Sequence, residues 1–144
     1  MPHLVILYTA KIDQLTDMTA LCRKLCNTLL EVHDDAGLQV FPTGGTRVLA
    51  YPAAHSAVAD GQRDYHFMYL NVRMAKGRSA SVHQRCGDAL VAVARQYLAP
   101  VFESHYIGVT VQVDEGHEVF DGKHSSIHPL FNPPSTTPPS QAKT

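Results

Sequence analysis

Pro2 is the residue of this chain with the clearest potential for chemistry. It stands directly before the apolar run HLVILYT, and a small second residue generally allows the initiator Met1 to be removed. The new terminus would then be a secondary amine, held at the end of a strand. Such an amine serves as a general base when its pKa lies near the working pH. Burial and nearby positive charge both lower the pKa of an amine, so Pro2 is a candidate base.

Arginines lie where loops meet the predicted elements. Arg47 follows the GGT loop at the start of a predicted strand, and Arg78 stands in KGRS, where a strand gives way to a helix. A guanidinium group stays protonated and binds carboxylates with a planar fork. The same residue could therefore bind an acidic substrate and depress the pKa of a terminal amine. Arg73, inside the preceding strand, is a third basic neighbour whose sheet face the sequence leaves open.

These residues also have simpler interpretations. Proline has no amide hydrogen, so strands accept it at their first position, where it needs no further role. A lone arginine beside a loop is commonly a solvated surface charge. The residue types alone leave both alternatives open.

The order of predicted elements decides how these residues are positioned. Apolar and branched runs indicate strands, while apolar residues spaced three and four apart indicate helices. Thr16 or Asp17 is the expected cap of the first helix and Gly37 its expected end. The expected elements are a strand at 3–9, this first helix with an apolar stripe between Leu15 and Val32, and a strand at 46–51. A strand at 64–74, a helix at 79–98 and a strand at 106–115 follow.

The repeat of strand, helix and strand predicts an α+β fold over residues 2–131. The two strands of such a unit are parallel when they pair in one sheet. Two units side by side give a four-stranded sheet with both helices on one face. The other face still carries apolar residues, which predicts an oligomer. Residues 132–144, NPPSTTPPSQAKT, have the composition of a disordered tail, and IHPLF before them is expected to dock on a surface or a neighbouring subunit.

Composition and charge limit the classes of molecule that this chain is expected to bind and the compartment in which it is expected to lie. The formal net charge of the 144-residue chain is −1, so nothing points to nucleic acid or an anionic membrane. The sequence lacks a recognisable signal peptide and any apolar run near the roughly 18 residues of a spanning helix, so we expect a cytoplasmic protein. Three cysteines are too few for a disulfide framework and are expected in the core. Only His124 and His128 have suggestive spacing; Pro129 argues against a helix there, and we expect no metal site.

Several motifs identify a family. The PH start, DGQRDYHF at 60–67, KGRS at 76–79 and the closing IHPLF are similar to the 5-carboxymethyl-2-hydroxymuconate Δ-isomerases of the tautomerase superfamily. The resemblance covers nearly all of residues 2–131. It implies a tautomerase-like tandem β-α-β fold, a homotrimer and no cofactor. The family uses an amino-terminal proline as its catalytic base, so the resemblance implies catalysis by Pro2 and substrate binding by Arg47 and Arg78.

The reaction that the resemblance implies is a proton transfer within an unsaturated acid that carries two or three carboxylates. 5-Carboxymethyl-2-hydroxymuconate would be converted from the dienol to the 2-oxo-3-ene acid, in the breakdown of homoprotocatechuate and 4-hydroxyphenylacetate. Two other hypotheses stay open. One is a tautomerase-fold enzyme acting on another unsaturated 2-oxo acid. The other is a non-catalytic trimeric module in which Met1 is retained and Pro2 only begins a strand.

We predict that most molecules of the purified protein lack Met1, because a catalytic amine at Pro2 must be free. Intact-mass measurement separates the two forms directly. A protein that keeps Met1 on most molecules would contradict the catalytic role of Pro2.

Overall fold

Two strand-helix-strand units make up the part of the chain that the computed structural model describes, residues 2–132. Both units have the expected element order, and short helical segments are added to it. The elements are β1 (His3–Thr9), the 3-10 helix η1 (Ala10–Gln14), α1 (Met18–Leu30), the 3-10 helix η2 (Thr43–Gly45), β2 (Arg47–Ala53), β3 (Tyr65–Met74), α2 (Ala80–Tyr97), α3 (Ala99–Ser104), β4 (Tyr106–Glu115) and α4 (His128–Phe131).

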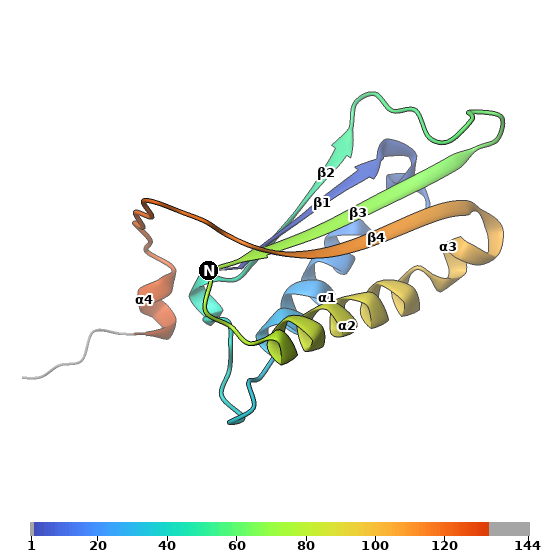
Figure 1. Cartoon of the computed structure of the whole chain (residues 1–144). Coiled ribbons are helices and arrows are strands. Elements are labelled where there is room, and N and C mark those ends of the chain that lie inside the picture. Colours follow the sequence, from blue (N-terminus) through green and yellow to red (C-terminus); the bar gives the residue numbers. More distant parts are fainter. Residues whose placement is uncertain (1, 133–144) are drawn as a thin grey trace, which may run out of the picture.

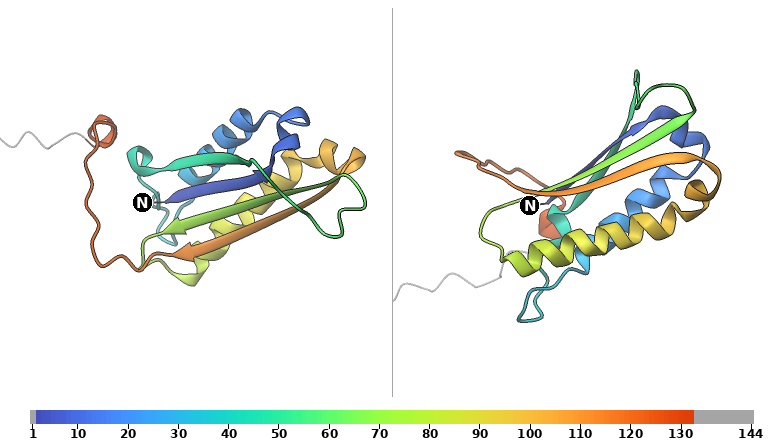
Figure 2. Two further views of the ribbon diagram at one scale, coloured as in Figure 1. Left: turned by 90° about the horizontal axis from the view of Figure 1, so that it is seen from above. Right: turned by 45° about the vertical axis from the view of Figure 1, so that its right-hand side comes forward.

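The four strands form one mixed sheet in the order β2-β1-β3-β4 (Figure 2). Within each unit the strands are parallel, as expected, so β1 pairs with β2 and β3 with β4. The two units meet through an antiparallel pairing of β1 with β3. The beginnings of β1 and β2 therefore lie at the same end of the sheet as the last residues of β3 and β4.

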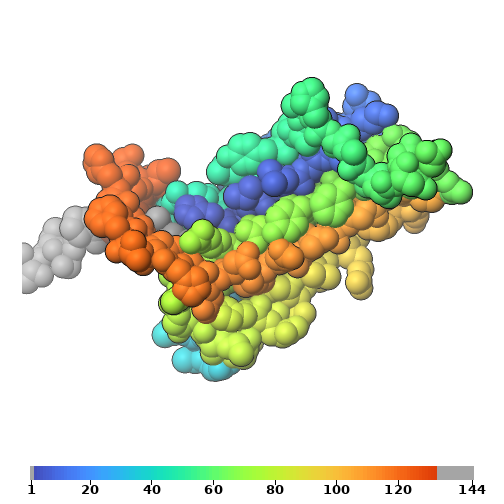
Figure 3. All heavy atoms as spheres, turned by 45° about the horizontal axis from the view of Figure 1, so that its top comes forward, coloured from blue at the N-terminus to red at the C-terminus, as the bar shows by residue number. Residues whose placement is uncertain are grey.

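Helices α1 and α2 cover one face of the sheet, which confirms the predicted architecture (Figure 1). Alternate strand residues such as Leu4, Ile6 and Leu70 are fully buried beneath them. The opposite face is open within this chain, and Figure 3 shows it as rows of side chains running along all four strands. Its large apolar residues, at 37% to 57% exposure, are Leu7, Leu49, Tyr51, Phe67 and Tyr106.

Side-chain caps fix where both long helices begin. The Asp17 carboxylate accepts a hydrogen bond from the Ala20 amide at 3.0 Å, and the Ser79 hydroxyl accepts one from the Val82 amide at 3.3 Å. The first helix ends at Leu30, well before Gly37, so its predicted length was wrong. Gly37 instead adopts a φ of +78° in a turn that reverses the chain, a conformation that glycine adopts without strain.

Pro52 and Pro129 stand within elements that were expected to end before them or not to form. Strand β2 was expected to stop before Pro52 but continues to Ala53. Because β2 is an edge strand, a residue without an amide hydrogen is accepted there. The short α4 also forms around Pro129, contrary to expectation. Pro129 lies in its first turn, where the amide would have no partner within the helix.

Helix α4 docks on η2 of its own chain (Figure 1). A methyl group at position 44 would lie 2.6 Å from the Cα atom of His128, so only glycine permits this approach. Ile127, Leu130 and Phe131 nevertheless stay more than half exposed. The expected docking is thus made by the backbone of α4, while its apolar side chains point elsewhere.

Cys26 and Cys86 are buried, Cys22 is half-buried, and all three are free thiols. This agrees with their predicted place in the core. Among residues 2–132 no helix combines the length and apolar character needed to cross a membrane. Apart from Asn132, the tail predicted at 132–144 lies outside the described residues.

We predict that Gly44→Ala releases α4, because the added methyl group collides with the His128 backbone. Hydrogen exchange should then accelerate at the amides of Leu130 and Asn132, which bond to carbonyl groups of Ile127 and His128. Gly87→Ala in α2 is the matched control. Its methyl group would lie 3.7 Å from Val113, and it should raise the stability by up to about 1 kcal/mol. Unchanged exchange in Gly44→Ala would contradict the close approach.

Candidate active site

Pro2 is buried at the end of the sheet where β1 begins. The next residue, His3, lies opposite Arg47 on β2 and opposite Arg73 on β3. Residues that face each other across neighbouring strands project from the same side of a sheet, and the adjoining Leu4 is buried under the helices. His3, Arg47 and Arg73 therefore share the open face. The side chain of Arg73, whose sheet face the sequence left open, thus lies on the open face. Two guanidinium groups therefore stand on the strands that flank Pro2.

A hollow of about 320 Å³ adjoins this end of β1. It is lined by His3, Arg73, Met74, Ala75, Glu118, Asp121 and Lys123. The last three belong to the irregular segment that follows β4, which the sequence argument did not connect with the site. That segment has no periodicity to place it, and only its density of charged residues could have drawn attention.

Charges in the hollow are partly paired. The Arg73 Nη2 atom lies 3.7 Å from Glu118 Oε1, and both side chains are about half exposed. Lys123 pairs with Asp121 within the same segment. Beside them, partial burial lowers the pKa of His3 below 6.5, and the positive charges of Arg47 and Arg73 lower it further. His3 is therefore a neutral imidazole at neutral pH, and the fixed cations beside it are arginines.

Arg78 lies at the same end of the sheet, in the turn between β3 and α2. Its guanidinium stacks over the buried Phe41 ring, 5.1 Å from the ring centroid, and donates a hydrogen bond to the Ala75 carbonyl at 3.0 Å. It lines a second hollow, with Lys76 and Gly77, and His3 is not among the residues that line it. Ala75 borders both hollows. The structure thus brings Arg47 beside Pro2 and leaves Arg78 one turn away.

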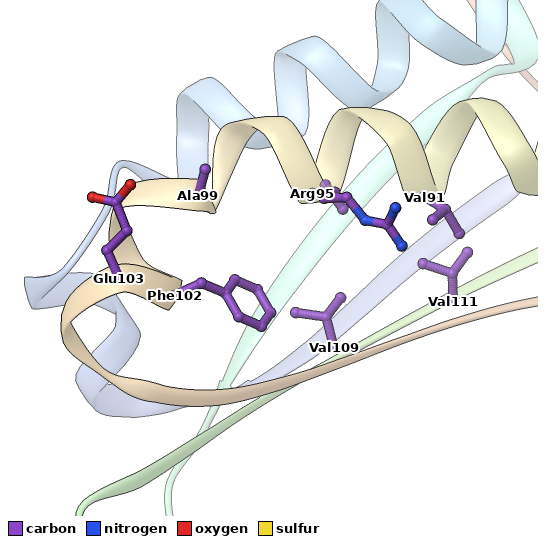
Figure 4. Close-up of a pocket in the computed structure, with 8 residues that line it drawn as sticks. Val91, Arg95, Ala99, Phe102, Glu103, Val109 and Val111 are labelled. Atoms are coloured by element: carbon purple, nitrogen blue, oxygen red, sulfur yellow. The ribbon is translucent and has the colours of Figure 1, made fainter.

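An apolar pocket of about 490 Å³ lies far from Pro2, between α2, α3 and β4. Figure 4 shows the Phe102 ring turned toward Val109 there, with Val111 beneath α2. Its charged lining residues are Arg95 and Glu103, and none of the candidate residues reaches it. In the described part of the chain no three metal-ligating side chains are grouped closely enough to hold an ion. The end of β1 is therefore the candidate active site.

This arrangement has the properties that acid–base chemistry on an anionic substrate requires. Pro2 is buried, and Arg47 and Arg73 supply positive charge on the strands beside it. Burial and positive charge both lower the pKa of an amine, and guanidinium groups bind carboxylates. A terminal amine at Pro2 would meet both conditions.

Comparisons with known proteins agree with one another. The model of the 5-carboxymethyl-2-hydroxymuconate isomerase family matches residues 2–131. A curated Escherichia coli protein named 5-carboxymethyl-2-hydroxymuconate Delta-isomerase is 27% identical over 131 residues, which cover 91% of this chain and 99% of that one.

Solved structures of the same name superpose on most of the chain. A crystal structure of a 5-carboxymethyl-2-hydroxymuconate delta-isomerase has 51% identity and a TM-score of 0.88, covering 91% of this chain and 93% of that one. Another, from Deinococcus radiodurans R1, has 30% identity and a TM-score of 0.79, covering 90% and 93%. They confirm the predicted fold.

We predict that the His3 imidazole titrates below its ordinary pKa of 6.5 and that Arg47→Gln moves the pKa part of the way back. Because the unfolded chain takes up this proton at higher pH than the folded chain, the stability due to neutral His3 is lost as the pH falls below 6.5. An NMR titration of the ring measures the pKa. Arg85→Gln, whose side chain pairs with Asp35, is the control; an equal effect of both variants would contradict the Arg47 contribution.

Proposed function

The chain belongs to the 5-carboxymethyl-2-hydroxymuconate isomerase family, and from this premise we propose that it isomerises 5-carboxymethyl-2-hydroxymuconate with Pro2 as general base. The observation that carries the proposal is the placement of Pro2. It is buried at the end of β1, with Arg47 across from the next residue. This placement supports the role that the family resemblance implies for Pro2.

The proposed reaction moves one proton and needs no cofactor. The neutral amine of Pro2 accepts the proton of the 2-hydroxyl group, and the C2 oxygen becomes a carbonyl. Electrons shift along the conjugated chain, and C5 receives a proton from the ammonium form of Pro2. The product is the 2-oxo-3-ene acid, and the amine is neutral again. Each step requires an amine whose pKa lies near the working pH.

Arg47 and Arg78 bind substrate carboxylates in this proposal and stabilise the charge that develops on the C2 oxygen. Arg47 is exposed on the open sheet face next to His3. Arg78 is held in place by the Phe41 ring and by the Ala75 carbonyl. A fixed guanidinium loses little freedom when it binds an anion, which favours affinity. The structure therefore supports different tasks, with Arg47 on the strand beside the base and Arg78 pre-positioned at the turn.

We further propose that the protein is a homotrimer. Leu7, Leu49, Tyr51 and Phe67 form an uncovered apolar surface on the open sheet face. Val119 and Phe120, beyond β4, are also almost fully exposed. Contiguous apolar surfaces of this kind are characteristic of interaction sites. A trimer that buries these surfaces is the assembly that the family resemblance implies.

The free cysteines support a cytoplasmic place for this reaction, because reduced thiols are usual there. The family resemblance implies a role for this reaction in the catabolism of homoprotocatechuate and 4-hydroxyphenylacetate. A different unsaturated 2-oxo acid is the alternative substrate, since the same base and arginines would serve it.

Pro2→Ala is the decisive variant. Alanine is also small, so Met1 should still be removed, but the amine becomes primary and loses its fixed direction. We expect turnover of the dienol, followed by ultraviolet absorbance, to fall about 100-fold or more, the usual scale for losing a general base. Pro100→Ala, at an exposed proline at the start of α3, is the matched control and should keep full activity.

Arg78→Ala separates binding from proton transfer in the same assay. It should mainly raise KM, because Arg78 binds a carboxylate and does not carry the proton. A turnover rate unchanged by Pro2→Ala would remove Pro2 as the base. Activity unchanged by Arg78→Ala would remove Arg78 from the site.

A further inference from the structure

We propose that Arg73, with His3 beside it, binds a third substrate carboxylate. In the absence of substrate the Arg73 guanidinium is paired with Glu118, and the substrate carboxylate displaces Glu118 when it binds. The inference rests on the proposed function. 5-Carboxymethyl-2-hydroxymuconate has a carboxylate at each end of the muconate chain and another on the carboxymethyl arm. Arg47 and Arg78 account for two of these groups, so one carboxylate lacks a partner.

Arg73 is correctly placed to be that partner. In the antiparallel pair it lies directly opposite His3, and His3 is the residue that follows Pro2 in the chain. His3 separates it from Arg47, which pairs with His3 on the other side. A substrate lying along the ends of these strands would therefore meet Arg47 and Arg73 on opposite sides of the base.

The guanidinium of Arg73 is available for a ligand. Its side chain is 54% exposed, and Glu118 lies 3.7 Å away, well beyond the roughly 2.7–2.9 Å of a good charge-assisted hydrogen bond. Asp114 lies next to Arg73 on β4, but its carboxylate accepts a hydrogen bond from Asn71 at 2.6 Å. Arg73 is thus held loosely by one acid, and an exposed pair of this kind contributes little to stability.

The surrounding hollow suits a short acidic arm. Its volume of about 320 Å³ lies between His3, Arg73 and the segment that carries Glu118 and Asp121. These two carboxylates would repel an anionic ligand, so Glu118 must move when the arm enters. His3 is neutral at neutral pH, and a neutral ring offers an N–H donor to a carboxylate without adding charge beside the base.

A third carboxylate contact would make Arg73 a specificity residue. A site built to hydrogen-bond one substrate group discriminates strongly against analogues that lack the group, because its polar atoms are then left unpaired. 2-Hydroxymuconate, which lacks the carboxymethyl arm, would bind to Arg47 and Arg78 and would leave the ion pair between Arg73 and Glu118 intact. Arg73 therefore governs the preference for the triacid over the diacid.

The kinetic test compares these two substrates in wild type, Arg73→Gln and Arg63→Gln. Arg63 is the matched control, because it bonds to Tyr106 at the opposite end of β4. We expect Arg73→Gln to lower kcat/KM for the triacid about 10- to 100-fold, the scale of one hydrogen bond to a charged group. The value for 2-hydroxymuconate should change less than about threefold on that reasoning, since no contact of the diacid is removed. Equal losses on both substrates, or none on either, would overturn the proposal.

A binding measurement makes the result independent of turnover. Isothermal titration calorimetry with tricarballylate and glutarate, a stable triacid and diacid, should show that the wild type prefers the triacid and that Arg73→Gln abolishes this preference. Glu118→Gln should strengthen tricarballylate binding several-fold, because it removes the competing carboxylate.

Binding and turnover measurements test separately the carboxylate site at Arg73 and the proposed isomerase function. A preference that persists in Arg73→Gln would overturn the third-carboxylate site even if Pro2-dependent turnover is normal. A preference that depends on Arg73, in a protein that does not turn over the dienol, would support the site and refute the proposed function.

Discussion

The antiparallel pairing of β1 with β3 is the constraint on which the site depends. Each strand-helix-strand unit alone brings together only the ends of its own two strands. The register that places His3 opposite Arg73 joins the units and turns the end of β3 toward Pro2. The turn that carries Arg78 and the segment after β4 are brought to the same edge. A parallel junction would have sent Arg73 and Arg78 to the far end of the sheet.

The buried face and the charged open face of the sheet meet at this edge. Leu4 and Met74 are almost fully buried below the sheet and fix the ends of two central strands. His3 and Arg73 project to the open face, where charge is solvated. Pro2 stands between the two environments. It is buried, and Arg47 and Arg73 lie on the two strands that flank it; in the proposed mechanism, burial and positive charge would both favour the neutral form of its amine.

Strand and helix periodicity was enough to predict the sheet, the helix face and the positions of Arg47 and Arg78 at element junctions. Periodicity describes single elements, however. How the two units pair depends on contacts between residues far apart in the sequence, which periodicity does not reveal. The face of Arg73 therefore became clear only from the register with His3. Glu118 and Asp121 were missed because their segment has no regular structure. The docking of α4 depends on the absence of a side chain at Gly44, which a pattern of apolar residues does not reveal.

The central claim, that the amine of Pro2 is the base, is tested most directly by its own titration. In protein labelled with ¹⁵N-proline and freed of Met1, the Pro2 nitrogen is the only proline nitrogen that is an amine and titrates. The account predicts that its pKa lies below the range of about 7.7–8.0 that is usual for terminal amines, and that kcat/KM rises with pH through the same value. An amine that titrates above this range, or an activity profile that does not follow it, would contradict the account.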